Sequence, residues 1–398
     1  MFRLSTYMSL LFAPSRSRRP PSGRAPRAPV VIWNLTRTCN LRCTHCYAFA
    51  ANGRFPGELT TAQAFEVVDD LATLNPPMVI LSGGEPLMRP DFFDIAAYAS
   101  DRGLRLTLSS NGCLIDDAAV ARIRALGFAY VGISLDGIGD VHDRFRGEPG
   151  SFDASLAGIR RCIGAGLSTG IRMTLAQENE HQLSEVLALA EREGAAKFYV
   201  SHLNYAGRGR IHRGKDLAHV RARRTMEILF EAAADFALRG SGPHIVTGNN
   251  DADGVYFLRW VAREMPERFD EMRAVLERWG GNATGEGVAN IDNRGEVHPD
   301  TMWWDHGLGN VKTRPFSHIW AQTRDPLMIG LRAKRRPLKG RCGSCPALAI
   351  CNGNTRTRAF AQCGDPWAED PGCYLTDEEL VTLNRFAPKE VAHALADR

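Results

Sequence analysis

Apolar residues follow two alternating patterns from residue 30 onward. Short, continuously apolar runs are typical of buried strands, and they alternate with longer stretches in which apolar residues recur every three or four positions, as on one face of a helix. The continuous runs predict strands over residues 30–35, 78–81, 104–108, 130–135, 170–175 and 197–203. The helical spacing predicts helices over residues 61–74, 91–99, 116–126, 152–165, 183–193 and about 217–239.

This alternation predicts an α/β fold with parallel strands joined by right-handed crossovers. The strand–helix units are fewer than the eight of a closed TIM barrel. We therefore expect a partial (β/α)6 TIM-like barrel, with a doubly wound sheet as the other arrangement that fits. In both, the loops at the carboxyl ends of the strands carry the chemistry.

The pattern divides the chain into three parts. Residues 1–29 combine a short amphipathic stretch with a basic, Pro- and Arg-rich arm, which we interpret as a solvated tail. Residues 30–240 form the predicted barrel. Residues 241–398 begin irregularly, and then residues 288–300 place a turn at Asp292-Asn293-Arg294-Gly295 between two short runs. That pattern predicts a β-hairpin, which we take to belong to a smaller second domain.

Composition narrows the class of protein. The chain has 398 residues, of which 44% are hydrophobic and 24% charged, as in ordinary globular proteins. The net charge is +4, but six arginines and no acid lie in residues 1–29, so the rest is slightly acidic and predicts no nucleic-acid partner. No uninterrupted apolar run is long enough for a membrane span. We expect a cytoplasmic protein without a membrane partner.

The ten cysteines are the unusual feature, because eight of them fall into two groups. The first group is Cys39-x3-Cys43-x2-Cys46, on the loop that follows the first predicted strand. Three thiolates on one loop suit a cubane iron–sulfur cluster with one open iron. A zinc ion would need a fourth ligand, which His45 is the nearest residue to supply, although neighbouring residues cannot easily all reach one tetrahedral ion.

This spacing resembles the signature of radical S-adenosylmethionine (SAM) enzymes, and Ser82-Gly83-Gly84-Glu85-Pro86 resembles the GGEP element of that family. The resemblance implies a [4Fe–4S] cluster on Cys39, Cys43 and Cys46. The cluster binds SAM at its open iron and cleaves it to a 5′-deoxyadenosyl radical that abstracts hydrogen. A low-potential flavodoxin- or ferredoxin-type protein would supply the electron. The implied SAM contacts are Gly83, Gly84, Glu85, Ser109, Asn111, Ser134, Asp136 and Arg172, with an adenine contact among residues 202–205.

The second cysteine group is Cys342-x2-Cys345-x5-Cys351, followed by Cys363 and Cys373. Its spacing alone fits zinc or a cubane equally. In context it resembles the SPASM or twitch domains of radical SAM enzymes, which carry auxiliary clusters. Asp300 and Thr355 stand where those domains have cysteines of a first auxiliary cluster, so the resemblance implies one auxiliary [4Fe–4S] cluster. Its expected ligands are Cys342, Cys345, Cys351 and Cys373, with Cys363 as the fallback for the fourth. We interpret Cys113 and Cys162 as buried, small apolar residues.

Segments along the whole chain resemble the NirJ-type enzymes of haem d1 biosynthesis. They include residues 31–35, 130–137, 142–146, 205–209, 247–254, 289–293, 298–304, 365–370 and 373–376. The resemblance implies an iron-containing tetrapyrrole substrate, 12,18-didecarboxysirohaem, from which the C3 and C8 propionates are removed to leave oxo groups. Arg208, His298 and His306 are candidate substrate contacts, the two histidines as ligands of the substrate iron.

Two other functions remain open at this point. One is a SPASM-type enzyme that modifies a peptide or protein, although residues 1–29 are too short for a peptide-recognition domain. The other is a non-catalytic iron–sulfur electron carrier, which would need neither an open cluster nor the GGEP element.

Overall fold

The computed structural model describes residues 1–12 and 28–385, and its centre is one nine-stranded sheet in the order β7-β6-β5-β4-β3-β2-β1-β8-β9. Every neighbouring pair is parallel except β8 and β9. The strands are β1 (Val30–Asn34), β2 (Val79–Ser82), β3 (Leu106–Ser110), β4 (Tyr130–Ser134), β5 (Thr169–Leu175), β6 (Lys197–His202), β7 (His244–Gly248), β8 (Val288–Ile291) and β9 (Val297–His298). The sheet stays open, with β7 and β9 at its edges, so the predicted partial barrel is confirmed.

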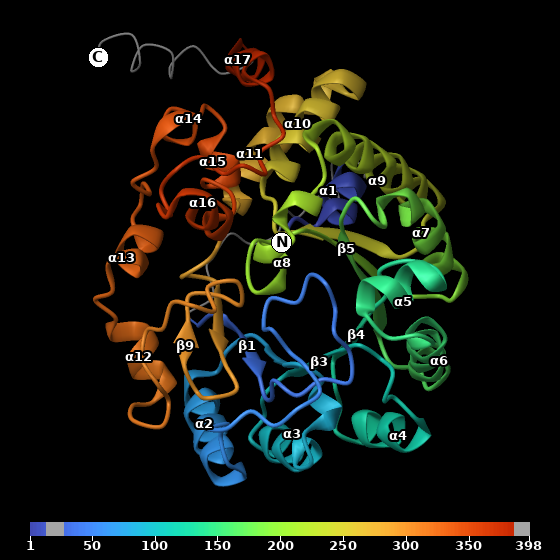
Figure 1. Ribbon diagram of the computed structural model, residues 1–398. Coiled ribbons are helices and arrows are strands. Elements are labelled where there is room, and N and C mark those ends of the chain that lie inside the picture. Colours follow the sequence, from blue (N-terminus) through green and yellow to red (C-terminus); the bar gives the residue numbers. More distant parts are fainter. Residues whose placement is uncertain (13–27, 386–398) are drawn as a thin grey trace.

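Helices line the outside of the curved sheet (Figure 1). Those that connect strands β1 to β7 are α2 (Thr61–Leu74), α3 (Phe92–Asp101), α4 (Asp117–Ala125), α5 (Asp140–Arg146), α6 (Ser151–Gly164), α7 (Leu183–Arg192), α8 (Arg208–Ile211) and α9 (His219–Arg239). Their formation follows local rules. Helix α2 begins at a capping box between Thr60 and Gln63, and it buries Val67, Val68 and Leu71. Truncating the fully buried Leu71 to Ala would cost about 2–5 kcal/mol of stability.

The predicted boundary between residues 240 and 241 falls inside the sheet-forming part of the chain. Strand β7 lies beyond it and pairs with β6, adding a seventh parallel strand to the six that were predicted. Strands β8 and β9 form the predicted hairpin, but β8 pairs in parallel with β1, so the hairpin extends the main sheet. The carboxyl ends of β1 to β7 therefore face one common region, which the hairpin flanks.

The N-terminal stretch is part of the core rather than a free arm. Helix α1 (Leu4–Phe12) packs on α9 and β7, and its Leu4 and Met8 side chains are fully buried. Phe2 stacks on Tyr7 and contacts Trp279. The expected amphipathic helix is thus present, whereas the Pro- and Arg-rich arm over residues 13–27 lies outside the described residues.

The C-terminal part is helical and covers one end of the sheet. Helices α10 (Ala252–Glu264) and α11 (Phe269–Trp279) come between β7 and β8. Short helices follow the hairpin: α12 (Phe316–Gln322), α13 (Pro326–Arg332), α14 (Gly340–Gly343), α15 (Leu348–Cys351), α16 (Arg356–Cys363) and α17 (Asp377–Arg385). Figure 1 shows them along one side of the molecule, from α12, which contacts α2, to α15, which contacts α10 and α11.

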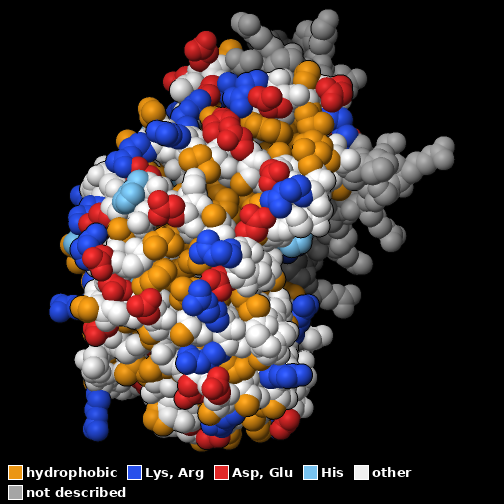
Figure 2. All heavy atoms as spheres, turned by 90° about the vertical axis from the view of Figure 1, so that its right-hand side faces the viewer, with side chains coloured by type: hydrophobic (Ala, Val, Ile, Leu, Met, Phe, Trp, Pro, Cys, Tyr) orange, Lys and Arg blue, Asp and Glu red, His pale blue; other side chains and the backbone are white. Residues whose placement is uncertain are grey.

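The surface in Figure 2 intersperses acidic and basic side chains on the face it shows, which offers no broad basic patch. Among the described residues, no helix combines the length and the apolar character that a membrane crossing requires.

Candidate functional site

The first cysteine loop leaves the end of β1 and lies directly against the loop that ends β2. A Cβ atom on Gly84 would come within 2.3 Å of the Thr38 carbonyl oxygen, and one on Gly83 within 2.5 Å of the Thr36 carbonyl oxygen. The Gly84 amide donates to the Thr36 carbonyl at 2.7 Å, and the Glu85 amide donates to the Thr38 carbonyl at 2.8 Å. The two glycines are thus required for backbone-to-backbone contact, which fixes the start of the cysteine loop.

Cys39, Cys43 and Cys46 form one group together with Leu41 and Ala50. The Leu41 amide donates to the Cys39 sulfur and the Ala50 amide to the Cys46 sulfur, each at 3.4 Å. Burial raises the pKa of the Cys39 thiol to about 12, so a bound metal would have to displace its proton. No three His, Cys, Asp or Glu side chains in residues 1–12 and 28–385 are gathered around a single-ion site. A cubane spreads its ligands more widely, because each sulfur binds a different iron.

Arg208, a predicted substrate contact, holds the cysteine loop. Its Nε donates to the Cys43 carbonyl at 2.6 Å and its Nη1 to the Ala50 carbonyl at 2.9 Å. The Arg208 amide also donates to the Cys46 carbonyl. Two nitrogens of the guanidinium are thus bonded to backbone carbonyls of the loop, whereas its buried Nη2 has no hydrogen-bond partner, and its contact with substrate stays a prediction.

Glu85 is fully buried and engaged by protein donors. Its carboxylate accepts from the Ser110 hydroxyl at 2.9 Å and from the amides of Asn111 and Leu87 at 2.8 and 3.3 Å. Burial raises the pKa of Glu85 to about 7. The residue ties the end of β2 to the end of β3, while its predicted contact with a SAM ammonium group stays a prediction.

Asp136, another predicted SAM contact, lies behind the cysteine loop. Its carboxylate accepts from the Thr174 amide at 2.6 Å and forms an ion pair with Arg146. Burial opposes ionisation of this fully buried group, but Arg146, His45, His142 and the Thr174 amide together outweigh burial and lower the Asp136 pKa. Its predicted contact with SAM stays a prediction.

The other predicted SAM contacts lie at neighbouring strand ends. Arg172 on β5 reaches across β4 over Gly132, where a Cβ atom would clash at 2.9 Å, and hydrogen-bonds the Ser109 hydroxyl on β3. Ser134 pairs with Arg172 in the strand register. Asn111 donates to Asn40, within the cysteine loop, at 2.7 Å. The structure thus brings Ser109, Ser134 and Arg172 together and places Asn111 beside the loop.

Four cysteines of the second group line one small cavity, together with Ala252, Leu348, Gly353 and other residues. They are Cys342, Cys345, Cys351 and Cys373, the predicted ligands. Cys363 lies elsewhere, on α16, where its exposed thiol contacts the carbonyls of Ala359 and Asp365. The cavity therefore supports Cys373 over Cys363 as the fourth ligand.

The remaining cysteines occupy different settings. Cys162 is fully buried in the core of α6, as expected. Cys113 is only partly buried; it packs against the first cysteine group and lies 3.5 Å from the Ser155 hydroxyl.

Ordinary polar contacts occupy the two positions where SPASM-type domains have cysteine. Asp300 accepts from the Thr284 hydroxyl and from the Met302 amide. The Thr355 hydroxyl donates to the Asn249 carbonyl at 2.9 Å.

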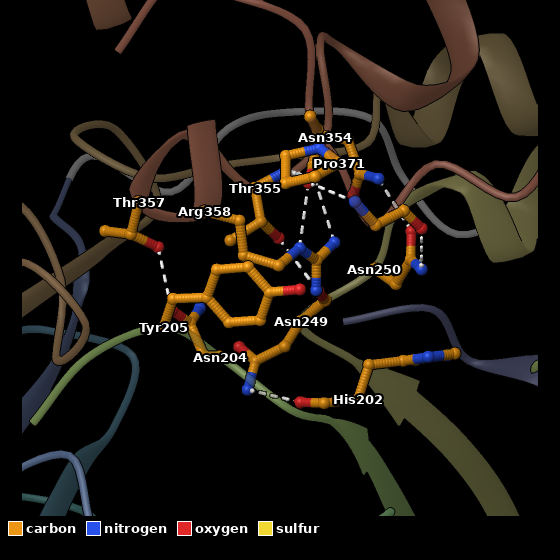
Figure 3. Close-up of polar contacts among 12 residues, drawn as sticks. His202, Asn204, Tyr205, Asn249, Asn250, Asn354, Thr355, Thr357, Arg358 and Pro371 are labelled. Carbon is orange, nitrogen blue, oxygen red and sulfur yellow. Dashed lines mark hydrogen bonds and ion pairs between the residues drawn. The ribbon is translucent and has the colours of Figure 1, made fainter. Parts of the chain in front are cut away.

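A buried ion pair joins the second cysteine region to the ends of β6 and β7. Arg358 forms two hydrogen bonds with Asp370, at 2.8 and 2.9 Å, and both side chains are almost completely buried. Its Nη1 also donates to the Leu203 and Asn249 carbonyls. Figure 3 shows the guanidinium among loops from both regions. The loop that follows Cys351 and the segment that precedes Cys373 are thereby anchored at the strand ends.

The two candidate histidines differ in burial and in how closely an aspartate approaches them. His298 is 2% exposed; its Nδ1 donates to the His306 carbonyl at 2.9 Å, and its Nε2 lies 3.6 Å from the Asp292 carboxylate. Its ring stacks on Trp304, which contacts Tyr47 beside Cys46. His306 Nε2 pairs with Asp325 at 3.0 Å. An Nδ1–H donated to a backbone carbonyl is the arrangement that orients a metal-ligating histidine, so the His298 Nε2 could serve as a ligand.

Sequence reasoning missed several residues of the site, namely Tyr47, Arg146 and Arg341. Arg146 and Arg341 each donate to a cysteine sulfur, Cys43 and Cys373, at 3.5 and 3.4 Å. Arg146 lies within a stretch that carried the family resemblance, whereas nothing in the spacing of Arg341 marked it.

Comparisons with known proteins agree with this geometry. The family model of the radical SAM superfamily matches residues 33–190. The chain is 50% identical to the pre-heme d1 synthase of Dinoroseobacter shibae, over all of this chain and 98% of that protein. It is 40% identical to the Fe-coproporphyrin III synthase of Methanosarcina barkeri, over 89% of this chain and 90% of that protein.

Solved structures share the fold. Native anSMEcpe with bound AdoMet superposes with a TM-score of 0.68 at 17% identity, covering 92% of this chain and all of that one. SuiB from Streptococcus suis bound to S-adenosylmethionine gives a TM-score of 0.68 at 18% identity, covering 88% of this chain and 78% of that one.

Proposed function

Because this chain belongs to the radical SAM superfamily, we propose that it is the member that acts on an iron-containing tetrapyrrole in haem d1 biosynthesis. The reaction is removal of the C3 and C8 propionates of 12,18-didecarboxysirohaem to leave oxo groups. The observation that carries the proposal is the 50% identity to a pre-heme d1 synthase along the whole chain.

The superfamily implies one [4Fe–4S] cluster and SAM, and the first cysteine loop suits both. Cys39, Cys43 and Cys46 would hold the cluster, and the three-sulfur loop leaves one iron open. When bound, the cluster and SAM supply a 5′-deoxyadenosyl radical that abstracts hydrogen. The protein contributes the close backbone contact of Gly83 and Gly84 with the start of the cysteine loop. It also contributes the polar side chains at the strand ends, which are Ser109, Ser134 and Arg172.

A second [4Fe–4S] cluster would occupy the cavity lined by Cys342, Cys345, Cys351 and Cys373. Four cysteines leave no iron open, which suits electron transfer rather than substrate binding. Such a cluster would accept the electron left after propionate loss, and a flavodoxin- or ferredoxin-type protein would supply the electron that starts the reaction.

His298 is the substrate contact that the geometry favours. Its Nδ1 is held by a backbone carbonyl, which would leave Nε2 to ligate the substrate iron, and Trp304 offers a flat ring beside it. Arg208 and His306 have partners in the protein, which makes them weaker candidates.

The decisive assay is anaerobic reconstitution with iron and sulfide, followed by reductant, SAM and didecarboxysirohaem. Mass spectrometry should show formation of 5′-deoxyadenosine and loss of two propionates. SAM cleavage without any mass change in the tetrapyrrole would refute the substrate and point to the peptide-modifying alternative. Absence of SAM cleavage in fully loaded protein would instead favour an electron carrier.

A further inference from the structure

A single guanidinium lies behind the first cysteine loop and contacts one of its sulfurs. Arg146, at the end of α5, donates from Nη1 to the Cys43 sulfur at 3.5 Å. Both side chains are shielded from solvent, with 7% of Arg146 and 8% of Cys43 exposed. The contact therefore joins a permanent positive charge to an expected cluster ligand in a region of low dielectric.

The surroundings fix this guanidinium in place. It pairs with Asp136, whose carboxylate is also held by the Thr174 amide. The Arg146 carbonyl accepts from the Arg42 amide within the cysteine loop at 3.0 Å. Arg146 is thus attached to the loop through its backbone and to the sheet through its counter-ion, so it cannot swing away from the sulfur.

Such a contact has a definite electrostatic consequence. Reducing a [4Fe–4S] cluster by one electron adds a negative charge to the cluster and its thiolates. A nearby positive donor to a thiolate stabilises the reduced form more than the oxidised form, and hydrogen bonds to sulfur are a known determinant of cluster potential. A buried negative group such as Asp136 acts in the opposite direction and limits the effect.

We propose that Arg146 is a positioning residue that raises the reduction potential of the cluster on Cys39, Cys43 and Cys46, with Asp136 as the opposing charge. The proposal rests on the assignment of those three cysteines in the proposed function, but not on the tetrapyrrole substrate. It explains why a fully charged ion pair is buried behind a cofactor loop, where it would otherwise only cost desolvation.

The test is a potentiometric titration of the anaerobically reconstituted full-length enzyme, followed by electron paramagnetic resonance. The relevant cluster is identified as the one whose signal changes on adding SAM. Arg146→Gln should make the equilibrium constant for reduction of this cluster about tenfold smaller. That change lowers the reduction potential by about 59 mV for one electron. Asp136→Asn should raise it. Arg144→Gln is the matched control, because it removes the same charge from the exposed side of the same helix.

Each outcome decides the proposal, because iron and sulfide content are measured alongside. An unchanged potential in fully loaded Arg146→Gln overturns it, and so does an equal shift in Arg144→Gln. If Arg146→Gln does not load a cluster, the variants Arg146→Lys and Asp136→Asn decide. A small decrease of the reduction potential in Arg146→Lys and an increase in Asp136→Asn support the proposal. An unchanged potential in both variants overturns it. Wrong assignment of the tetrapyrrole would leave these potentials unaffected, whereas wrong assignment of the cysteines would remove the SAM-responsive signal.

Discussion

The two cysteine groups differ in where they lie and in how many sulfurs surround each site. The first belongs to one loop at the end of β1 and offers three cysteines. The second draws four cysteines from three separate segments around one cavity. An incomplete ligand set leaves room for chemistry at the metal, while a complete one favours electron transfer. Under the proposed function, radical generation would belong to the barrel and electron handling to the C-terminal region.

The anchoring of the two sites differs as well. Backbone contacts of Gly83, Gly84 and Arg208 hold the first loop, so its shape depends on close approach of main chains. The second region depends on the buried Arg358–Asp370 pair, which joins it to the ends of β6 and β7. This buried pair is joined by neutral hydrogen bonds, from the Thr355 hydroxyl to the Asn249 carbonyl and from the Thr357 hydroxyl to the Asn204 side chain, in tying the second region to the barrel.

The largest expected effect is on the chemistry of the open site. Cys43→Ala should abolish SAM cleavage, because one iron of the expected cluster loses its ligand. Cys373→Ala should retain SAM cleavage while losing the tetrapyrrole product. Counting 5′-deoxyadenosine and product by mass spectrometry checks both, and SAM cleavage by Cys43→Ala would contradict the assignment.

Iron content tests the ligand set of the closed site. Cys373→Ala should lose about four irons per chain, whereas Cys363→Ala should keep the full complement, because Cys363 lies outside the cavity. Colorimetric iron and sulfide analysis of reconstituted protein provides the measurement. If Cys363→Ala lost the iron and Cys373→Ala kept it, Cys363 would replace Cys373 as the fourth ligand.

Stability tests the anchoring. Arg358→Met leaves the Asp370 carboxylate buried without its partner and should lower the free energy of unfolding by about 3–5 kcal/mol. Asp235→Asn removes an exposed partner of Arg239 and should cost less than about 1 kcal/mol. Denaturant titration compares the two, and equal costs would show that the buried pair does not carry the anchoring.

Substrate affinity separates the two histidines. His298→Ala should weaken binding of didecarboxysirohaem about tenfold, because it removes the proposed iron ligand beside Trp304, while His306→Ala, whose Nε2 is paired with Asp325 at 3.0 Å, should change it little. Absorption titration of the tetrapyrrole into the protein measures both. Unchanged affinity in His298→Ala would remove that residue from the site.

The smallest expected effect compares the two arginine–sulfur contacts. Arg341→Gln should lower the potential of the auxiliary cluster by less than Arg146→Gln lowers that of the barrel cluster. Arg341 is more exposed and pairs with Asp377, whose side chain is 84% exposed, so water screens its charge. The potentiometric titration described above gives both values; a larger shift from Arg341→Gln would contradict this account.

The sequence predicted the regular elements of the barrel well, because their apolar periodicity is long and repeated. Helix α2 has the predicted bounds, Thr61–Leu74. Helix α5 was missed because its seven residues are too few to show a period. Strand β7 was missed because it lies in a stretch rich in Gly and Asn, where flanking signals favour loops.

The site was predictable in its residue types but not in their contacts. Positions at the ends of strands predicted that Ser109, Ser134 and Arg172 lie close together, and they do. Such positions also suggested Glu85 and Asp136 as ligand contacts, although both carboxylates are held by protein donors. A position at the end of a strand specifies an edge of the sheet, but the direction of a side chain depends on partners far away in sequence, such as Arg146.

The most direct test of the central claim is hyperfine spectroscopy of the reduced enzyme with SAM labelled by ¹⁵N at the methionine amino group. If the three-cysteine site alone binds SAM, Cys373→Ala should show coupling between the label and the remaining cluster, and Cys43→Ala should show none. Coupling to the cluster that remains in Cys43→Ala, or no coupling in loaded Cys373→Ala, would contradict the division of roles between the two sites.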